Sequence, residues 1–224
     1  MKKITLTCAH AIVKYLIAQK ILINGKKEPL FPGVFGIFGH GNVACLGQAL
    51  EENQKELPTY RGHHEQNMAL TGIGYARAKR RQQIFVATSS VGPGATNMVT
   101  AAGVAMSNRL PILFLPGDTY ANRMPDPVLQ QVEHFNNPGI TANDAFKPVT
   151  RYFDRITRPE QIIQSFQLFK LCLILQIVGQ LVLLYVKISK VKPLIIQRNF
   201  LKREFMQLED LDQMNFKLKK QLKK

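Results

Sequence analysis

The chain has few cysteines: Cys8, Cys45 and Cys172 are the only three in 224 residues. They are odd in number, scattered and without CxxC spacing, so neither a disulfide framework nor a zinc site is a reasonable first interpretation. Each is expected to be a small buried hydrophobe of a reducing compartment. The amino terminus has no long apolar core and no small-residue cleavage site, so we expect no signal peptide and a cytoplasmic location.

Acidic residues are also scarce, with 15 Asp and Glu against 30 Lys and Arg. The imbalance is uneven along the chain, because residues 1–167 carry a net charge of +7 and the much shorter stretch 168–224 carries +8. A strongly basic chain suggests nucleic acid as a partner. Here the excess belongs to the tail, which lacks interleaved aromatic residues or a known motif, and we therefore expect no nucleic-acid partner.

Residues 1–167 alternate between helical periodicity and short, continuously apolar runs. This alternation is typical of a parallel sheet with helices on both faces, the doubly wound α/β class. Ligands of such sheets bind at the carboxyl ends of the strands. Helices are expected over 7–21, from Asn42 through 50, over 65–80, 95–106 and 159–169, and strands over 33–39, 57–60, 83–88 and 110–115; the stretch 116–149 is expected to be a functional loop.

Two motifs follow predicted strands and precede predicted helices. Gly92-Pro93-Gly94-Ala95-Thr96-Asn97 allows close approach of the backbone to a ligand, although by itself it also fits an ordinary tight turn. Its spacing matches neither a P-loop nor a dinucleotide fingerprint, so ATP and NAD have little support. In the second motif, Tyr60 to Gln66, a carboxylate at Glu65 could exchange a proton with a ligand ring nitrogen, or could simply be a helix-start glutamate.

The histidines give weaker signals. His63 and His64 are adjacent, so their side chains diverge, and no ligand cluster accompanies them; we assign no metal ligand and expect a surface or packing role. His40 lies between two glycines in Phe38-Gly39-His40-Gly41-Asn42, where it could face a substrate. A role in stabilising the turn fits His40 equally well.

Taken in order, these motifs resemble thiamine-diphosphate enzymes, and the resemblance covers roughly residues 5–170. The HEQ and GPGATN elements are similar to acetolactate synthase and its relatives. FGHGN and DPVLQQVE resemble the trihydroxycyclohexane-1,2-dione hydrolases of myo-inositol catabolism. The runs that carry the likeness are FGIFGHGNV, YRGHHEQNMA, ATSSVGPGATNMVTAA, NRLPILFLPGD, PDPVLQQVEHF and NDAFKPVTRYFDRITRPEQ.

The resemblance implies a pyrimidine-binding domain that takes up one half of thiamine diphosphate. Glu65 would be catalytic: it would hydrogen-bond the aminopyrimidine ring and promote the imino tautomer, which removes the thiazolium proton. Pro93 and Asn97 would lie near the pyrimidine, and His40 and Asn42 on the substrate side. Lys147 follows an Asp-Ala-Phe run where acetolactate synthases have glutamine; it would suit an anionic intermediate, or be a plain surface salt bridge.

In the same family the diphosphate and Mg²⁺ are held by a carboxyl-terminal domain with a GDG…N motif, acting across a dimer interface. No such motif follows residue 170. The resemblance therefore implies a truncated hydrolase of ring C–C bonds with a small-molecule substrate, inactive alone. A homodimer or a separately encoded carboxyl-terminal fragment would be its partner.

The chain is expected to divide into a pyrimidine-binding domain, 1–167, and an aberrant apolar and basic tail, 168–224. We interpret the tail as an out-of-frame translation, because restoring one base near the Lys170 codon permits a continuation similar to the same hydrolases. The alternative is a membrane-tethered or regulatory binding module that uses the apolar segment 168–188 and the basic tail.

Overall fold

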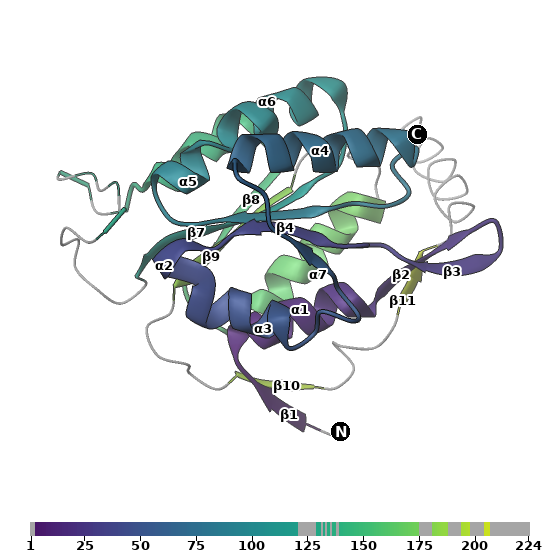
Figure 1. Cartoon of the computed structure of the whole chain (residues 1–224). Coiled ribbons are helices and arrows are strands. Elements are labelled where there is room, and N and C mark those ends of the chain that lie inside the picture. Colours follow the sequence, from purple (N-terminus) through teal and green to yellow (C-terminus); the bar gives the residue numbers. More distant parts are fainter. Residues whose placement is uncertain are drawn as a thin grey trace, which may run out of the picture.

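The computed structural model describes residues 3–120, 129–130, 132, 134, 136–137, 139–174, 181–187, 194–197 and 204–206 (Figure 1). The strands are β1 (Lys3–Leu6), β2 (Gln19–Ile23), β3 (Lys26–Pro29), β4 (Val34–Ile37), β5 (Thr59–Tyr60), β6 (Val86–Ser89), β7 (Leu113–Tyr120), β8 (Tyr152–Ile156), β9 (Leu181–Lys187), β10 (Leu194–Gln197) and β11 (Glu204–Met206). The helices are α1 (Cys8–Ala18), α2 (Gly39–Asn42), the π-helical turn η1 (Val43–Gly47), α3 (Gln48–Glu51), α4 (Glu65–Ala78), α5 (Pro93–Thr96), α6 (Val99–Asn108), the 3₁₀ helix η2 (Ala142–Val149) and α7 (Gln161–Ile174).

A six-stranded sheet in the order β5-β4-β6-β7-β9-β8 forms the centre of the molecule. Every neighbouring pair in it is parallel. Helices α4, α5 and α6 lie over one face, and α1, α3 and α7 over the other (Figure 1). The predicted doubly wound α/β class is thus confirmed, and the carboxyl ends of the strands carry the loops in which the motifs lie.

The two cores follow the alternation of side chains along the central strands. Val86 and Leu113 point into the core that contains α1 and α7, whereas Ala87 and Phe114 point into the core beneath α4 and α6. Successive residues of a strand face opposite sides of a sheet. A strand covered by helices on both faces must therefore be apolar at every position, and this accounts for the uninterrupted hydrophobic runs in the sequence.

Several of the predicted helices differ from the structure: the one expected over 95–106 is divided between α5 and α6, and the one expected over 159–169 runs on to Ile174. The helix expected over 7–21 begins as predicted, with the Thr7 hydroxyl accepting the backbone N–H of His10, but it ends at Ala18. Residues 19–23 instead pair with β3 around Asn24-Gly25, both at positive φ (51° and 75°), a turn that favours a hairpin. The second predicted helix begins at Gly39 rather than after a cap at Asn42.

The proposed boundary at residue 167 falls within α7, which runs on to Ile174, and β9 lies in the central sheet between β7 and β8. The division into a domain and an out-of-frame tail stays a prediction. The apolar segment 168–188 is shared between a helix and a strand, with 175–180 and 188 outside the described residues. Within the described part of the chain, no helix combines the length and the apolar character needed to cross a bilayer.

Candidate functional site

Glu65 is the first residue of α4, and its carboxylate is oriented by the turn that follows β6. His64 precedes the helix and caps it, since its ring Nδ1 accepts the backbone N–H of Asn67 at 3.4 Å. Oε2 of Glu65 accepts a hydrogen bond from Nδ2 of Asn97 at 2.7 Å. Among the described residues, no donor is bonded to the second oxygen, Oε1, which leaves it available for a ligand.

The Gly92–Asn97 turn approaches this carboxylate through its glycines. A Cβ placed on Gly94 would lie 3.2 Å from Oε1 of Glu65, so the absence of a side chain there keeps the space beside the carboxylate open. Gly92 has φ +61°, and a Cβ on it would come within 1.7 Å of the backbone oxygen of Gln130. Glycine is therefore required at Gly92 both by its dihedral angles and by this contact. Pro93 is exposed at the first position of α5.

His40, in the short helix α2, is exposed and contacts Gln130, a residue of the DPVLQQVE motif that was not itself proposed for the site. Its Nδ1 lies 3.2 Å from Oε1 of Gln130, which also accepts the hydroxyl of Ser90 at 2.7 Å. Gly39 makes this approach possible, because a Cβ there would lie 2.6 Å from Cβ of Ser90. Gln130 falls in the 116–149 stretch expected to be a functional loop, but sequence signals did not single it out, because its position depends on a long-range contact.

Asn42 does not present its side chain to the open side of the site. It is fully buried, and its Nδ2 donates to the backbone oxygen of Ser89 at 2.8 Å. Its Oδ1 has no hydrogen-bond partner among the described residues. The buried amide, bonded to the last residue of β6, fixes α2 against the end of that strand.

Lys147 lies apart from these residues, in η2. Its ammonium pairs with Asp144 at 2.7 Å and lies 5.3 Å from the centroid of the Phe153 ring. Neither partner belongs to the predicted site. The described geometry of Lys147 is therefore that of the salt bridge considered above as its alternative role.

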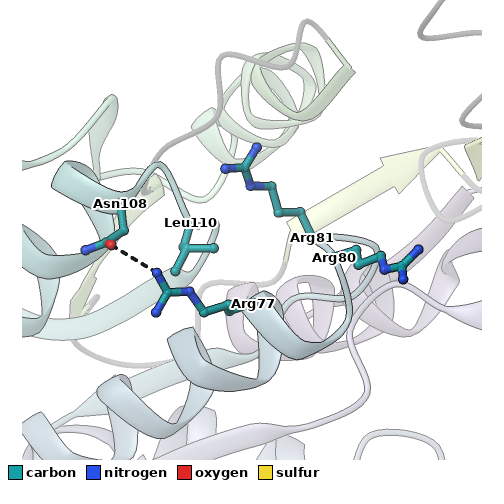
Figure 2. A pocket seen from close by; sticks show the side chains of 5 residues that line it. All are labelled: Arg77, Arg80, Arg81, Asn108 and Leu110. Atoms are coloured by element: carbon teal, nitrogen blue, oxygen red, sulfur yellow. Dashed lines mark hydrogen bonds between the residues drawn. The ribbon is translucent and has the colours of Figure 1, made fainter.

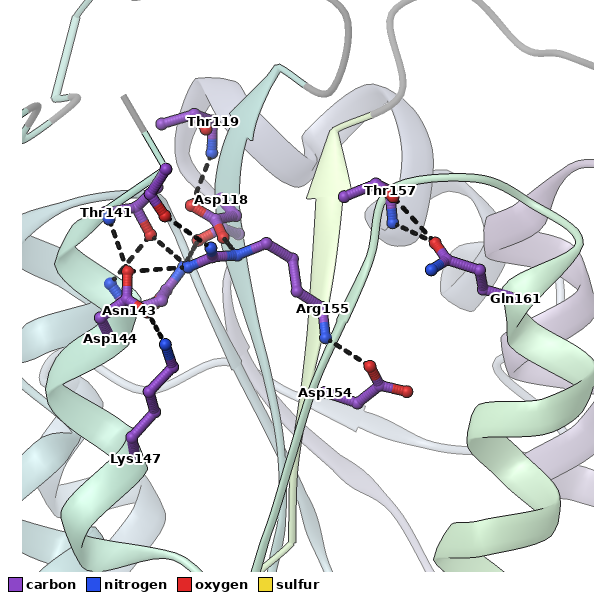
Figure 3. A network of polar contacts seen from close by, with 12 residues as sticks. Asp118, Thr119, Thr141, Asn143, Asp144, Lys147, Asp154, Arg155, Thr157 and Gln161 are labelled. Carbon is purple, nitrogen blue, oxygen red and sulfur yellow. Dashed lines mark hydrogen bonds and ion pairs between the residues drawn. The ribbon is translucent and has the colours of Figure 1, made fainter. Parts of the chain in front are cut away.

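A second polar network joins the ends of β7 and β8 (Figure 3). Arg155 donates from Nε to Asp118 at 2.8 Å and from Nη2 to Asp144 at 3.0 Å and Thr141 at 2.9 Å. A further bond runs from Nη1 to the backbone oxygen of Gly139 at 3.1 Å. One guanidinium thus connects β8, β7 and the segment that leads into η2, which is well suited to hold the loops at this edge in place.

The electrostatics of this network favour the ionised form of Asp144. Burial raises the pKa of Asp144, but hydrogen bonds from Lys147, the Thr141 N–H and Arg155 outweigh it and hold this pKa below its usual value. Among the described residues, no group of three or more His, Cys, Asp or Glu side chains is close enough to hold a metal ion. The described part of the site is thus built from hydrogen-bonding groups and glycines.

Comparisons with known proteins agree with this geometry. Residues 30–137 match the family model of the thiamine pyrophosphate enzyme N-terminal TPP-binding domain. This part of the chain belongs to the thiamine pyrophosphate enzyme family. The matched range contains the Glu65 and Gly92–Asn97 motifs, and it ends before Lys147. Thiamine pyrophosphate, another name for thiamine diphosphate, is accordingly the cofactor of this domain family.

The similar curated proteins are named 3D-(3,5/4)-trihydroxycyclohexane-1,2-dione hydrolase. Those of Listeria monocytogenes serotype 4b (strain F2365) and Bacillus subtilis (strain 168) are each 52% identical over 164 residues, 73% of this chain and 26% of the relative. That of Clostridium tetani is 53% identical over 165 residues, 74% of this chain and 26% of the relative. The chain therefore spans about a quarter of the length of the curated relatives it matches. The alternative of a membrane-tethered module gains no support from these comparisons or from the described helices.

Proposed function

We propose that this chain supplies the pyrimidine half of a thiamine diphosphate site, with Glu65 as the acid that hydrogen-bonds the cofactor's ring. The observation that carries the proposal is the unequal environment of the two carboxylate oxygens. Oε2 is fixed by Asn97, while Oε1 faces the space beside Gly94 and has no donor among the described residues. One oxygen orients the group and the other is left for a ring nitrogen.

The residues of this chain would bind and orient the ring, and Glu65 would share a proton with it. A carboxylate that is partly withdrawn from water forms a stronger hydrogen bond to a basic ring nitrogen than an exposed one does. Thiamine diphosphate, when bound, supplies a carbon that attacks a carbonyl and stores the resulting negative charge. Asn97 would fix the orientation of the Glu65 carboxylate. Pro93, the first residue of α5, would lie beside the pyrimidine ring.

We further propose that the substrate is that of the relatives, a trihydroxycyclohexane-1,2-dione whose ring C–C bond is cleaved by water. The exposure of His40 and its contact with Gln130 support this proposal, because both side chains offer polar groups that could bind such a polyol. Asn42 would act by fixing the segment after β4 through its bond to Ser89. The diphosphate and Mg²⁺ would be held by a separately encoded carboxyl-terminal fragment, in the cytoplasm.

A chimaera tests this function directly. The aligned stretch of the Bacillus subtilis relative is replaced by that of this chain, and dione hydrolysis is measured with thiamine diphosphate and Mg²⁺. We expect an active enzyme, and a loss of about 10² to 10⁴-fold in kcat for Glu65→Gln, the usual contribution of a positioned proton-transfer group.

His63→Gln is the matched control, because His63 is exposed, is two positions from Glu65 and has no described contact with Asn97 or Gly94. Its activity should stay close to that of the parent chimaera. Activity of Glu65→Gln equal to that of the control would contradict the proposed role of the carboxylate.

A further inference from the structure

A basic pocket lies at the far end of α4 from Glu65. It has a volume of about 320 Å³ and is lined by Arg77, Arg80, Arg81, Asn108 and Leu110 (Figure 2). Cavities of roughly 300 Å³ or more are the size that small ligands use. Helix α4 has 14 residues, and at about 1.5 Å per residue it separates this pocket from Glu65 by roughly 20 Å. The pocket is thus distinct from the thiamine site.

Among the described residues, no acidic side chain neutralises the charges of this pocket. All three arginines are exposed, and within the described part of the chain none of them forms a salt bridge. The described side-chain hydrogen bond is a long one, from Nη2 of Arg77 to Oδ1 of Asn108 at 3.4 Å. Cations gathered at one site repel one another unless an anion lies between them.

The backbone adds independent support, because two of these arginines occupy a conformation that disfavours side chains. Arg80 has φ 52° and Arg81 has φ 66°, and Arg109, between two lining residues in sequence, has φ 53°. A residue with a Cβ pays about 1–2 kcal/mol in this left-handed region, whereas glycine enters it freely. A hydrogen bond from the N–H of Arg81 to the backbone oxygen of Ala76, at 2.7 Å, closes the turn after α4. Glycine at the left-handed positions would form this turn with less conformational strain.

We infer that this pocket binds a small phosphate-bearing anion. The planar guanidinium group donates two parallel hydrogen bonds to phosphate oxygens, and two such groups around one anion neutralise its charge. Figure 2 shows Arg77 and Arg81 on the side of Leu110, while Arg80 points away from them. Asn108 accepts the long hydrogen bond from Arg77, and the buried Leu110 forms an apolar floor. Arg77 and Arg81 are thus the principal ligands of the anion.

Isothermal titration of the full chain with inorganic pyrophosphate and with orthophosphate, in low salt, tests the inference. We expect saturable binding of pyrophosphate, with the weaker binding of orthophosphate reflecting its lower charge. Arg77→Ala should weaken pyrophosphate binding by about tenfold or more, the loss expected for a bidentate charged contact. Thiamine, which has no phosphate, should not compete, and Glu65→Gln should bind pyrophosphate as well as the parent chain does.

Arg81→Gly separates binding from folding. Glycine relieves the left-handed strain, so the urea midpoint of this variant should be unchanged or higher while its pyrophosphate affinity falls. Arg158→Ala is the control for charge alone, because it removes an exposed guanidinium from the turn before α7. The inference is overturned by an absence of saturable binding, by unchanged affinity in Arg77→Ala and Arg81→Gly, or by an equal loss in Arg158→Ala.

Discussion

Replacement of Arg155 by methionine is expected to destabilise the domain strongly, although Arg155 is 22% exposed at its side chain. The reason lies in Asp118, which is only 2% exposed and accepts the Nε of Arg155 at 2.8 Å. Methionine preserves much of the apolar stem of arginine and removes the charge. The carboxylate of Asp118 would then be left in the interior with the N–H of Thr119 as its remaining described donor.

The magnitude follows from the burial of the orphaned group. Breaking a buried ion pair by removing one partner costs about 3–5 kcal/mol, and partial access of water to the guanidinium lowers the expected cost to about 3 kcal/mol. With a urea m-value of about 2 kcal/mol/M, the unfolding midpoint should fall by roughly 1.5 M. The loss of the bonds to Thr141, Asp144 and Gly139 acts in the same direction.

Urea unfolding of the full chain, followed by far-ultraviolet circular dichroism, measures this shift. Lys147→Met is the matched control: it breaks a pair to Asp144 in which the lysine side chain is 58% exposed, so it should cost at most about 1 kcal/mol. The double variant Asp118→Asn, Arg155→Met should lose less than the sum of its single variants, because no unpaired charge is left. A midpoint for Arg155→Met equal to that of Lys147→Met would refute the reasoning.

Two further predictions concern titration. The folded protein holds the pKa of Asp144 below its usual value. The ionised carboxylate therefore stabilises the fold above the pKa of Asp in the unfolded chain, about 3.9, and this stabilisation is lost as the pH falls through the lower folded pKa. Asp144→Asn should accordingly flatten the decline in urea midpoint below about pH 4. A decline equally steep in Asp144→Asn would rule this out. Burial, with smaller contributions from Cys45 and Glu160, raises the pKa of Cys8 to about 12, so iodoacetamide at about pH 8 should leave Cys8 unmodified in the folded chain and alkylate it in urea. Peptide mass spectrometry reads both sites, with the half-buried Cys45 as internal comparison; equal alkylation rates would contradict the burial of Cys8.

The predicted elements that held are those with local causes. The start of α1, where the Thr7 hydroxyl caps the helix, and the start of α4 at Glu65 depend on hydrogen bonds within a few residues. The continuous apolar strands reflect burial on two faces, which sequence composition records directly. Where a local preference competed with a more distant pairing, the pairing decided the structure: residues 19–23 left the helical pattern to pair with β3.

The sequence by itself determined the α/β class and the order of its motifs, because these follow from periodicity and from backbone freedom at glycine; the contact of Glu65 with Asn97, 32 residues further along the chain, was implied only by the family resemblance. Only the tertiary structure decided that Asn42 is buried, that Gln130 contacts His40, and that Arg155 reaches Asp118 across 37 residues of chain. Contacts of this kind depend on the register of strands and on the packing of loops at one edge of the sheet. Both are set by the free energy of the whole fold, and no short stretch of residues encodes them.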